Sequence, residues 1–322
     1  DVLRQVLSVA SVEGESFTAQ AVALVLGMDE LHTLRLLREQ LAARHRLVRE
    51  QGERNAGGRA LSNYRFVHFL FQQHLYQGLG EGERRLMHHR MGEALEQLYA
   101  GRLEEVAVQL VRHFAGDGER ELRYARLAGE RAAALRANEE ALRHLSRALE
   151  LTGAGECIER YELLLARERV YGLIGRRDAQ LKDLLELEAL VERLGSEQQA
   201  AVALRRAVHA IHGGNYRAAI IASQTAVERA HASAQTAVQA WGHLRWGQAL
   251  HRQGENFAAQ AHFAEALTLA RACGLRVVEA QALSWLAECA LDPAQVQKRY
   301  WQDALRIARE AGDRWSEGDI LA

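Results

Sequence analysis

Along most of the chain, apolar residues return at the three- and four-residue spacing of amphipathic helices. A longer period lies over this pattern, because from about residue 120 onward an alanine followed by an aliphatic residue recurs every 37 to 41 residues. These alanines are Ala148, Ala189, Ala226, Ala266 and Ala304. One helix pair cannot bury its apolar faces alone, so a repeat of this length predicts stacked helix pairs.

Residues that favour helix starts precede these alanines at matching intervals. They are Asn138, Asp178, Asn215, Asn256 and Asp292, and Pro293 follows the last of them as a proline in the first helical position would. Two helices per period are clearest at Trp241–Arg252 and Phe257–Cys273, which Gly254 separates. In the second helix we expect one buried stripe, made of Phe257, Ala261, Ala264, Leu267 and Ala270.

The first 80 residues have a different pattern. Three short apolar-periodic segments predict three helices, with Thr18 capping the second. Residues 47–50 and 64–66 then predict two short strands around a flexible turn that contains Gly57 and Gly58. Three helices followed by a β-hairpin are the order of a winged helix.

Composition supports a folded, mainly helical chain. The 322 residues are 48% apolar and 26% charged, and they include only one proline, which argues against a turn-rich sandwich or barrel. The net charge of −1 gives no global attraction for nucleic acid or an anionic membrane. Neither of the two lysines follows the glycine pattern of a phosphate-binding loop.

The cysteines and the apolar runs bear on location. Cys157, Cys273 and Cys289 form no Cys-x-x-Cys pair, so we expect three buried thiols in a reducing compartment rather than disulfides or zinc ligands. No apolar stretch reaches the roughly 18 residues of a membrane span. We therefore expect a cytoplasmic protein without membrane contact. Because the chain starts at Asp1 without methionine and stops inside an amphipathic segment, we also expect it to be a fragment.

The repeating segment resembles the tetratricopeptide repeat. The small, aromatic and alanine positions of that family are matched by Gly247, Leu250, Gly254, Phe257, Ala259, Phe263, Ala266 and Leu267. A second match is Ala207, Gly214, Tyr216, Ala219, Ala226 and Val227, and a looser one is Gly129, Ala141, Leu145, Ala148 and Leu149. The resemblance implies an all-α fold, a right-handed α-solenoid of helix pairs behind a small winged-helix domain.

The run from Phe66 to Tyr76, together with the helical pattern of Glu83–Leu98, resembles the end of the winged-helix domain in STAND signalling ATPases. Large bacterial regulators of the maltose-activator or cyclase-linked type belong to that class. The resemblance implies a winged helix at 1–80, a helical linker at 81–118 and a repeat superhelix at 119–322. It also implies an NTPase domain, absent from this chain, that would bind ADP or ATP.

In that family a histidine after the wing contacts the bound nucleoside diphosphate, and His68 has the matching place. An imidazole near a helix N-terminus can donate to a phosphate. Phe69 stands where relatives often have aspartate, which puts the accompanying polar contact in doubt. The alternative is that His68 only packs beneath the wing. In this chain alone we expect no stably bound cofactor.

Candidate ligand residues follow from the expected inner wall of the superhelix, which the first helix of each pair builds. They are Trp241, Gln248, His251, Arg252 and His212. An aromatic plate beside guanidinium and amide donors can hold a small-molecule inducer, a peptide or a protein partner. The alternative is that Trp241 and Trp246 only fill helix junctions.

The sequence therefore predicts a non-catalytic sensor or regulatory arm whose winged helix couples ligand binding to an NTPase domain. No catalytic motif occurs, and the histidine pairs His88-His89 and His209-His212 lack further ligands for a metal. One alternative is a protein-protein scaffold. Another alternative is that the chain is part of a transcription regulator, in which the wing contacts DNA through five arginines between residues 44 and 59. The expected third helix has no excess positive charge, which disfavours DNA binding.

Overall fold

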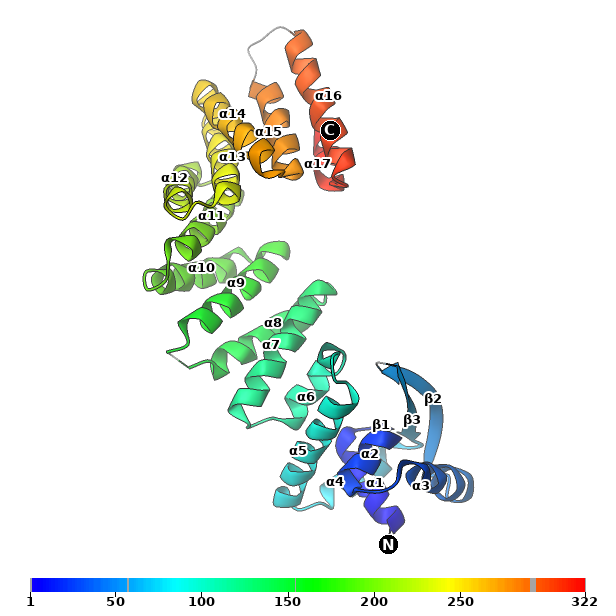
Figure 1. The fold of residues 1–322 in the computed structure, drawn as a ribbon. Helices are drawn as coiled ribbons and strands as arrows, with labels where there is room; N and C mark the ends of the chain where they lie inside the picture. Colours follow the sequence, from blue (N-terminus) through cyan, green and yellow to red (C-terminus); the bar gives the residue numbers. More distant parts are fainter. Residues whose placement is uncertain (1, 57, 154, 290–293, 322) are drawn as a thin grey trace. The chain divides into compact units, whose positions relative to one another are not determined.

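The computed structural model describes residues 2–56, 58–153, 155–289 and 294–321. Its contacts divide the chain into two compact units, Asp1–Gly153 and Ala154–Ala322. Figure 1 shows helices almost throughout, with one small sheet in the first unit. The expected repeat region therefore contributes one helix pair to the first unit and the remaining helices to the second.

The N-terminal part of the first unit surrounds a three-stranded sheet. Its elements are α1 (Val2–Glu13), β1 (Ser16–Thr18), α2 (Ala19–Leu26), α3 (Glu30–Arg35), the π-helical segment η1 (Leu36–Arg44), β2 (Val48–Ala56), β3 (Arg59–Phe66), α4 (Phe69–Gln77), α5 (Glu81–Leu98), the 3-10 turn η2 (Leu103–Glu105) and α6 (Ala107–His113). Both β1 and β2 pair antiparallel with β3. One apolar core joins these elements and extends to Tyr124 in the following helix. The segment expected to link two domains thus packs on the N-terminal helices.

The hairpin is longer than the sequence predicts. β2 continues through the polar stretch to Ala56, with a register shift between Glu50 and Gly52. The prediction of a flexible turn over these residues was wrong. The side chains of β2 are mostly exposed and show no alternation of apolar and polar residues, so the sequence gives no strand signal there. A strand nevertheless forms, because pairing with β3 requires only backbone hydrogen bonds. The prediction for Thr18 was wrong too: its hydroxyl donates to Glu13 Oε1 (2.9 Å) and makes no capping bond.

Helix pairs fill the rest of the chain. The first unit ends with α7 (Gly118–Ala134) and α8 (Asn138–Leu151); the second contains α9 (Cys157–Leu173), α10 (Arg177–Val191), α11 (Ser196–His212), α12 (Tyr216–Ala232), α13 (Thr236–Arg252), α14 (Asn256–Cys273), α15 (Arg276–Cys289), α16 (Ala294–Glu310) and α17 (Arg314–Leu321). Within each unit, consecutive helices pack on each other (Figure 1). The predicted α-solenoid of tetratricopeptide-like pairs is confirmed.

One member of the alanine period was assigned wrongly. Ala148, Ala226, Ala266 and Ala304 are fully buried, but Ala189 is exposed. Leu187, two residues earlier, is buried at the same distance from the start of its helix as those alanines. The correct period is more regular than the predicted one, because the second helices begin at residues 138, 177, 216, 256 and 294.

The predicted helix starts are close, but only Asn215 acts as a cap, accepting from the Ala218 N–H at 3.1 Å. Asn138, Asp178 and Asn256 lie in the first turn instead. Asp292 and Pro293 lie outside the described residues.

The expected buried stripe of the second helix, α14, was wrong at Phe257, Ala261 and Ala264, which are exposed, and right at Ala270, which is buried. Phe257 is 86% exposed, and the buried face is made by Ala259, Phe263 and Ala266 together with Ala270. Alanines occur on both faces of this helix, so the spacing alone could not choose between them.

Two cysteines are less buried than expected. Cys289 is buried, but Cys157 is half-buried and Cys273 is exposed. Over the described residues, no helix is both long and apolar enough to cross a bilayer.

Candidate functional site

His68 lies on the surface of the first unit, at the start of α4. Its Nδ1 accepts from the Leu70 N–H at 3.3 Å, so the imidazole caps the helix. Its ring stacks on Phe69 (centroids 5.4 Å apart) and meets the edge of Phe71. In this unit the ring is exposed and does not pack beneath the hairpin.

An apolar patch surrounds His68. Val67, Phe69, Leu70 and Phe71 are each about half exposed, and none of the residues of α4 is buried. Adjacent exposed aromatic and aliphatic side chains of this kind mark an interaction surface. We call these five residues, 67–71, the His68 patch.

In the second unit, the structure brings three of the five predicted ligand residues near an arginine that the sequence analysis missed. The Arg245 guanidinium lies over the Trp241 ring, with 4.9 Å from its carbon to the ring centroid. Its Nη1 donates to Gln248 Oε1 at 2.7 Å. His212 lies near enough for the charge of Arg245 to lower its pKa. We call Trp241, Arg245, Gln248 and His212 the Arg245 cluster.

The positions of these residues follow from helix geometry. Trp241, Arg245 and Gln248 are four and three residues apart, so they share one face of α13. His212 is the last residue of α11, which packs against α13. The cluster therefore joins two successive repeats.

The electrostatics of the cluster are one-sided. Burial lowers the pKa of Arg245 to about 10. Partial burial, followed by the positive charges of Arg177, Arg245 and His209, lowers the pKa of His212. Among the described residues no carboxylate forms an ion pair with Arg245. Arg245 thus lacks the acid that normally accompanies a buried arginine.

His251 and Arg252, the other two predicted residues, belong to a different cluster. His251 Nδ1 lies 2.9 Å from Asn256 Oδ1 and 3.2 Å from Cys289 Sγ, and its ring contacts Trp285. Arg252 lies over the same Trp285 ring. Burial raises the pKa of the Cys289 thiol to about 11, so this Cys-His contact supplies no thiolate nucleophile.

A buried polar network in α9, α10 and α11 was not predicted. Glu168 is fully buried and accepts from Gln180 Nε2 (2.6 Å) and Arg205 Nε (2.8 Å). Beside it, Arg167 binds Asp183 through two hydrogen bonds of 2.9 and 2.6 Å. The sequence pattern does not reveal such residues, because a charged side chain on a helix is normally expected to face solvent.

Two histidine pairs were missed for the same reason. His88 and His113 in the first unit place their Nδ1 atoms 2.9 Å apart, and His243 and His262 in the second place theirs 3.0 Å apart. Burial lowers the pKa of His113 to about 3 and that of His262 to about 4. Within the described residues, no three histidine, cysteine or acidic side chains converge as metal ligands.

A cavity of about 400 Å³ opens between α10, α11 and α12. Small and aliphatic side chains form most of its lining, including Val191, Val202, Ala222 and the exposed Ile221. The ion pair between Arg206 and Glu188 (2.7 Å) lies at its wall. Such a cavity can take an apolar group, and its chemistry does not suggest catalysis.

Comparisons with known proteins identify the fold. No family model and no curated protein sequence matches the chain. A STAND protein with a tetratricopeptide repeat sensor from Pyrococcus horikoshii has a similar structure over all of this chain and 53% of its own length, at 14% identity and a TM-score of 0.52. This chain thus spans about half of that protein.

Two further solved structures are similar. Aspartyl phosphate phosphatase F from Bacillus subtilis matches 78% of this chain and 71% of its own, at 16% identity and a TM-score of 0.58. BtubC from P. vanneervenii matches 68% of this chain and 93% of its own, at 17% identity and a TM-score of 0.53. At these identities the likeness shows a shared helical-repeat fold.

Proposed function

We propose that this chain is the regulatory arm of a STAND-type signalling ATPase. In this proposal the repeat helices bind a ligand or protein partner, and the N-terminal 80 residues form a winged helix that passes the effect to an NTPase domain. The chain itself performs no catalysis. Coupling of this kind requires that the ligand bind two states of the whole protein with different affinity.

The His68 patch is the observation that carries the proposal. An exposed histidine at a helix start can donate to a phosphate, and the surrounding apolar side chains provide a surface for a domain to cover. The similarity to the STAND protein with a repeat sensor supports the same order of parts, since it extends over the whole chain.

The test uses the protein that carries this chain in its natural reading frame. We expect His68→Ala to lower the ADP that co-purifies with it by several-fold and to raise its ATP hydrolysis, because one contact to the diphosphate is lost. His74→Ala is the matched control, since His74 is also exposed on α4. Unchanged ADP content and hydrolysis in His68→Ala would contradict the proposal.

A further inference from the structure

Arg245 is the starting point, because most of its hydrogen-bonding capacity is unused. A guanidinium carries five N–H donors, and one edge, formed by Nε and Nη2, matches the two oxygens of a carboxylate or phosphate. Here Nη1 is held by Gln248 Oε1. Nε is buried without a hydrogen-bond partner, and the described residues provide none for Nη2 either. Neither nitrogen of the edge suited to an oxyanion therefore has an acceptor among the described residues.

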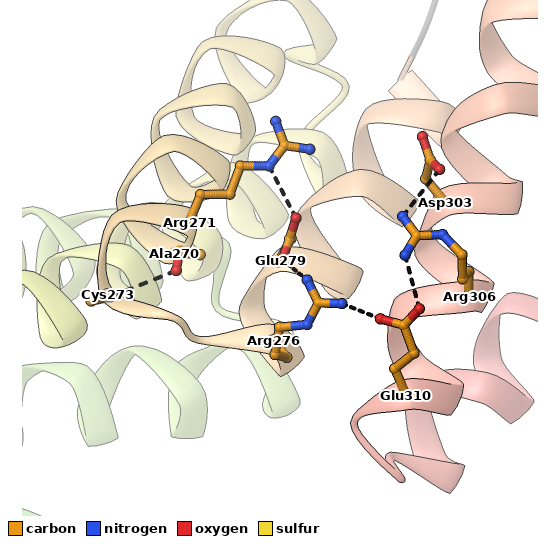
Figure 2. Close-up of polar contacts among 8 residues, drawn as sticks. All are labelled: Ala270, Arg271, Cys273, Arg276, Glu279, Asp303, Arg306 and Glu310. Atoms are coloured by element: carbon orange, nitrogen blue, oxygen red, sulfur yellow. Dashed lines mark hydrogen bonds and ion pairs between the residues drawn. The ribbon is translucent and has the colours of Figure 1, made fainter.

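Several other arginines of the same unit are neutralised by carboxylates. Figure 2 shows Arg271 and Arg276 sharing Glu279 (3.0 and 2.8 Å), and Arg306 bound to Glu310 (2.9 Å). Arg205, on the helix that precedes α13 by one repeat, binds the buried Glu168. Arg245 has no such carboxylate among the described residues, although burial makes its charge more costly.

The neighbours of Arg245 on α13 hold its position. Trp241 provides a flat surface for the guanidinium, and Gln248 fixes its orientation. A side chain fixed at two points and left open at its third edge is prepared for a ligand.

We propose that the Arg245 cluster binds its ligand through an oxyanion, a carboxylate or a phosphate, which pairs with the Nε–Nη2 edge of Arg245. Trp241 offers its ring to the adjoining part of the ligand. The oxyanion belongs to the ligand that the repeat helices bind in the proposed function above, so this proposal rests on that function. It excludes His251 and Arg252, which are engaged with Trp285 and Cys289.

The test follows the thermal unfolding of this chain with inorganic phosphate or acetate as probe, at constant ionic strength. We expect the wild-type midpoint to rise by about 2–4 °C near saturation with at least one probe. A rise with phosphate alone assigns a phosphate ligand, and a rise with acetate alone assigns a carboxylate. No rise with either probe overturns the proposal.

Variants show whether the effect belongs to Arg245. Arg245→Met should abolish the rise, and Arg245→Lys should weaken it because lysine keeps the charge but lacks the fork. Arg193→Met, at an exposed arginine of the same unit, should retain it. Equal loss in Arg193→Met, or a full rise in Arg245→Met with helicity intact, would overturn the proposal. These results are independent of the ADP measurement on His68→Ala, so either proposal can fail alone.

Discussion

Two helix pairs of the second unit, α9–α10 and α13–α14, fill equivalent positions with opposite chemistry. The twelfth residue of the first helix is Gly247 in α13 and Glu168 in α9. The fourth residue of the second helix is Ala259 in α14 and Gln180 in α10. All four residues are buried or closely packed. The helices of α13–α14 meet through small residues that lie against Phe263, whereas the helices of α9–α10 meet through hydrogen bonds.

The comparison shows that the repeat backbone tolerates either solution when every buried polar group has a partner. The α9–α10 network meets this condition, with Arg167 on Asp183 and Arg205 on Glu168. In the α13–α14 pair, the contact between the two helices is apolar and needs no such partner. Arg245 on α13, however, has a buried N–H without a hydrogen-bond partner. The proposed oxyanion would supply the partner that Arg245 lacks.

The largest effect is expected from Glu168→Ala. Removing this carboxylate leaves the buried Gln180 and the half-buried Arg205 without their acceptor, which should lower the free energy of unfolding by about 3–5 kcal/mol. Urea denaturation measures it. Glu188→Ala, which removes the half-exposed partner of Arg206, is the control and should cost about 1 kcal/mol or less.

The same measurement can test the comparison further. Replacing Glu168, Gln180 and Arg205 together by alanine, alanine and leucine imitates the small contact of α13–α14 and should recover most of the loss. A triple variant less stable than Glu168→Ala would show that the two solutions are not interchangeable.

Gly247→Val should have the next largest effect. A Cβ at Gly247 would lie 2.5 Å from the Phe263 ring, so the ring and α14 must shift, at a cost of about 1–3 kcal/mol. Gly318→Ala in α17, where a Cβ meets nothing, should be neutral or stabilise by up to about 1 kcal/mol. Equal effects in the two variants would contradict the close approach.

The histidine pair beside α13–α14 predicts a pH dependence. His262 has a depressed pKa of about 4 in the folded chain, below its unfolded value of 6.5, so its contribution to stability is complete above 6.5 and lost as the pH falls through about 4. The unfolding free energy of wild type should fall over this window, and His262→Gln should fall less. His231→Gln, at an exposed histidine, should follow wild type.

The smallest effect is expected from Arg245→Met without ligand, and its sign differs from that of Arg205→Met. Removing an unpaired buried cation should raise the free energy of unfolding by about 1 kcal/mol or less, whereas Arg205→Met leaves Glu168 uncompensated and should lower it. A marked loss in Arg245→Met would mean that Arg245 has an acid partner in solution.

The sequence was enough to predict the helical-repeat fold, because apolar periodicity and a repeat near 39 residues report directly on stacking. It located both helices around Gly254 within a few residues. It failed at Ala189, because a leucine, Leu187, has the buried position in that helix. It failed at Phe257, because alanines on two faces of α14 made the buried stripe ambiguous.

The candidate site could be predicted only in part. Trp241 and Gln248 were named from the sequence because an aromatic residue and an amide on a first helix suggest a binding surface, and the structure places both beside Arg245. Arg245 was missed, because among 39 arginines the sequence cannot show which one lacks a carboxylate. That property depends on partners from α9 to α13, which only the folded arrangement specifies.

The most direct test of the Arg245 cluster is the side-chain Nε–Hε resonance of Arg245, assigned by its disappearance in Arg245→Lys and followed during titration with phosphate or acetate. We predict a saturable shift of this resonance as the Nε–Nη2 edge gains an acceptor, while that of Arg193 stays unchanged. A resonance of Arg245 that does not move while those of other arginines do would contradict the account.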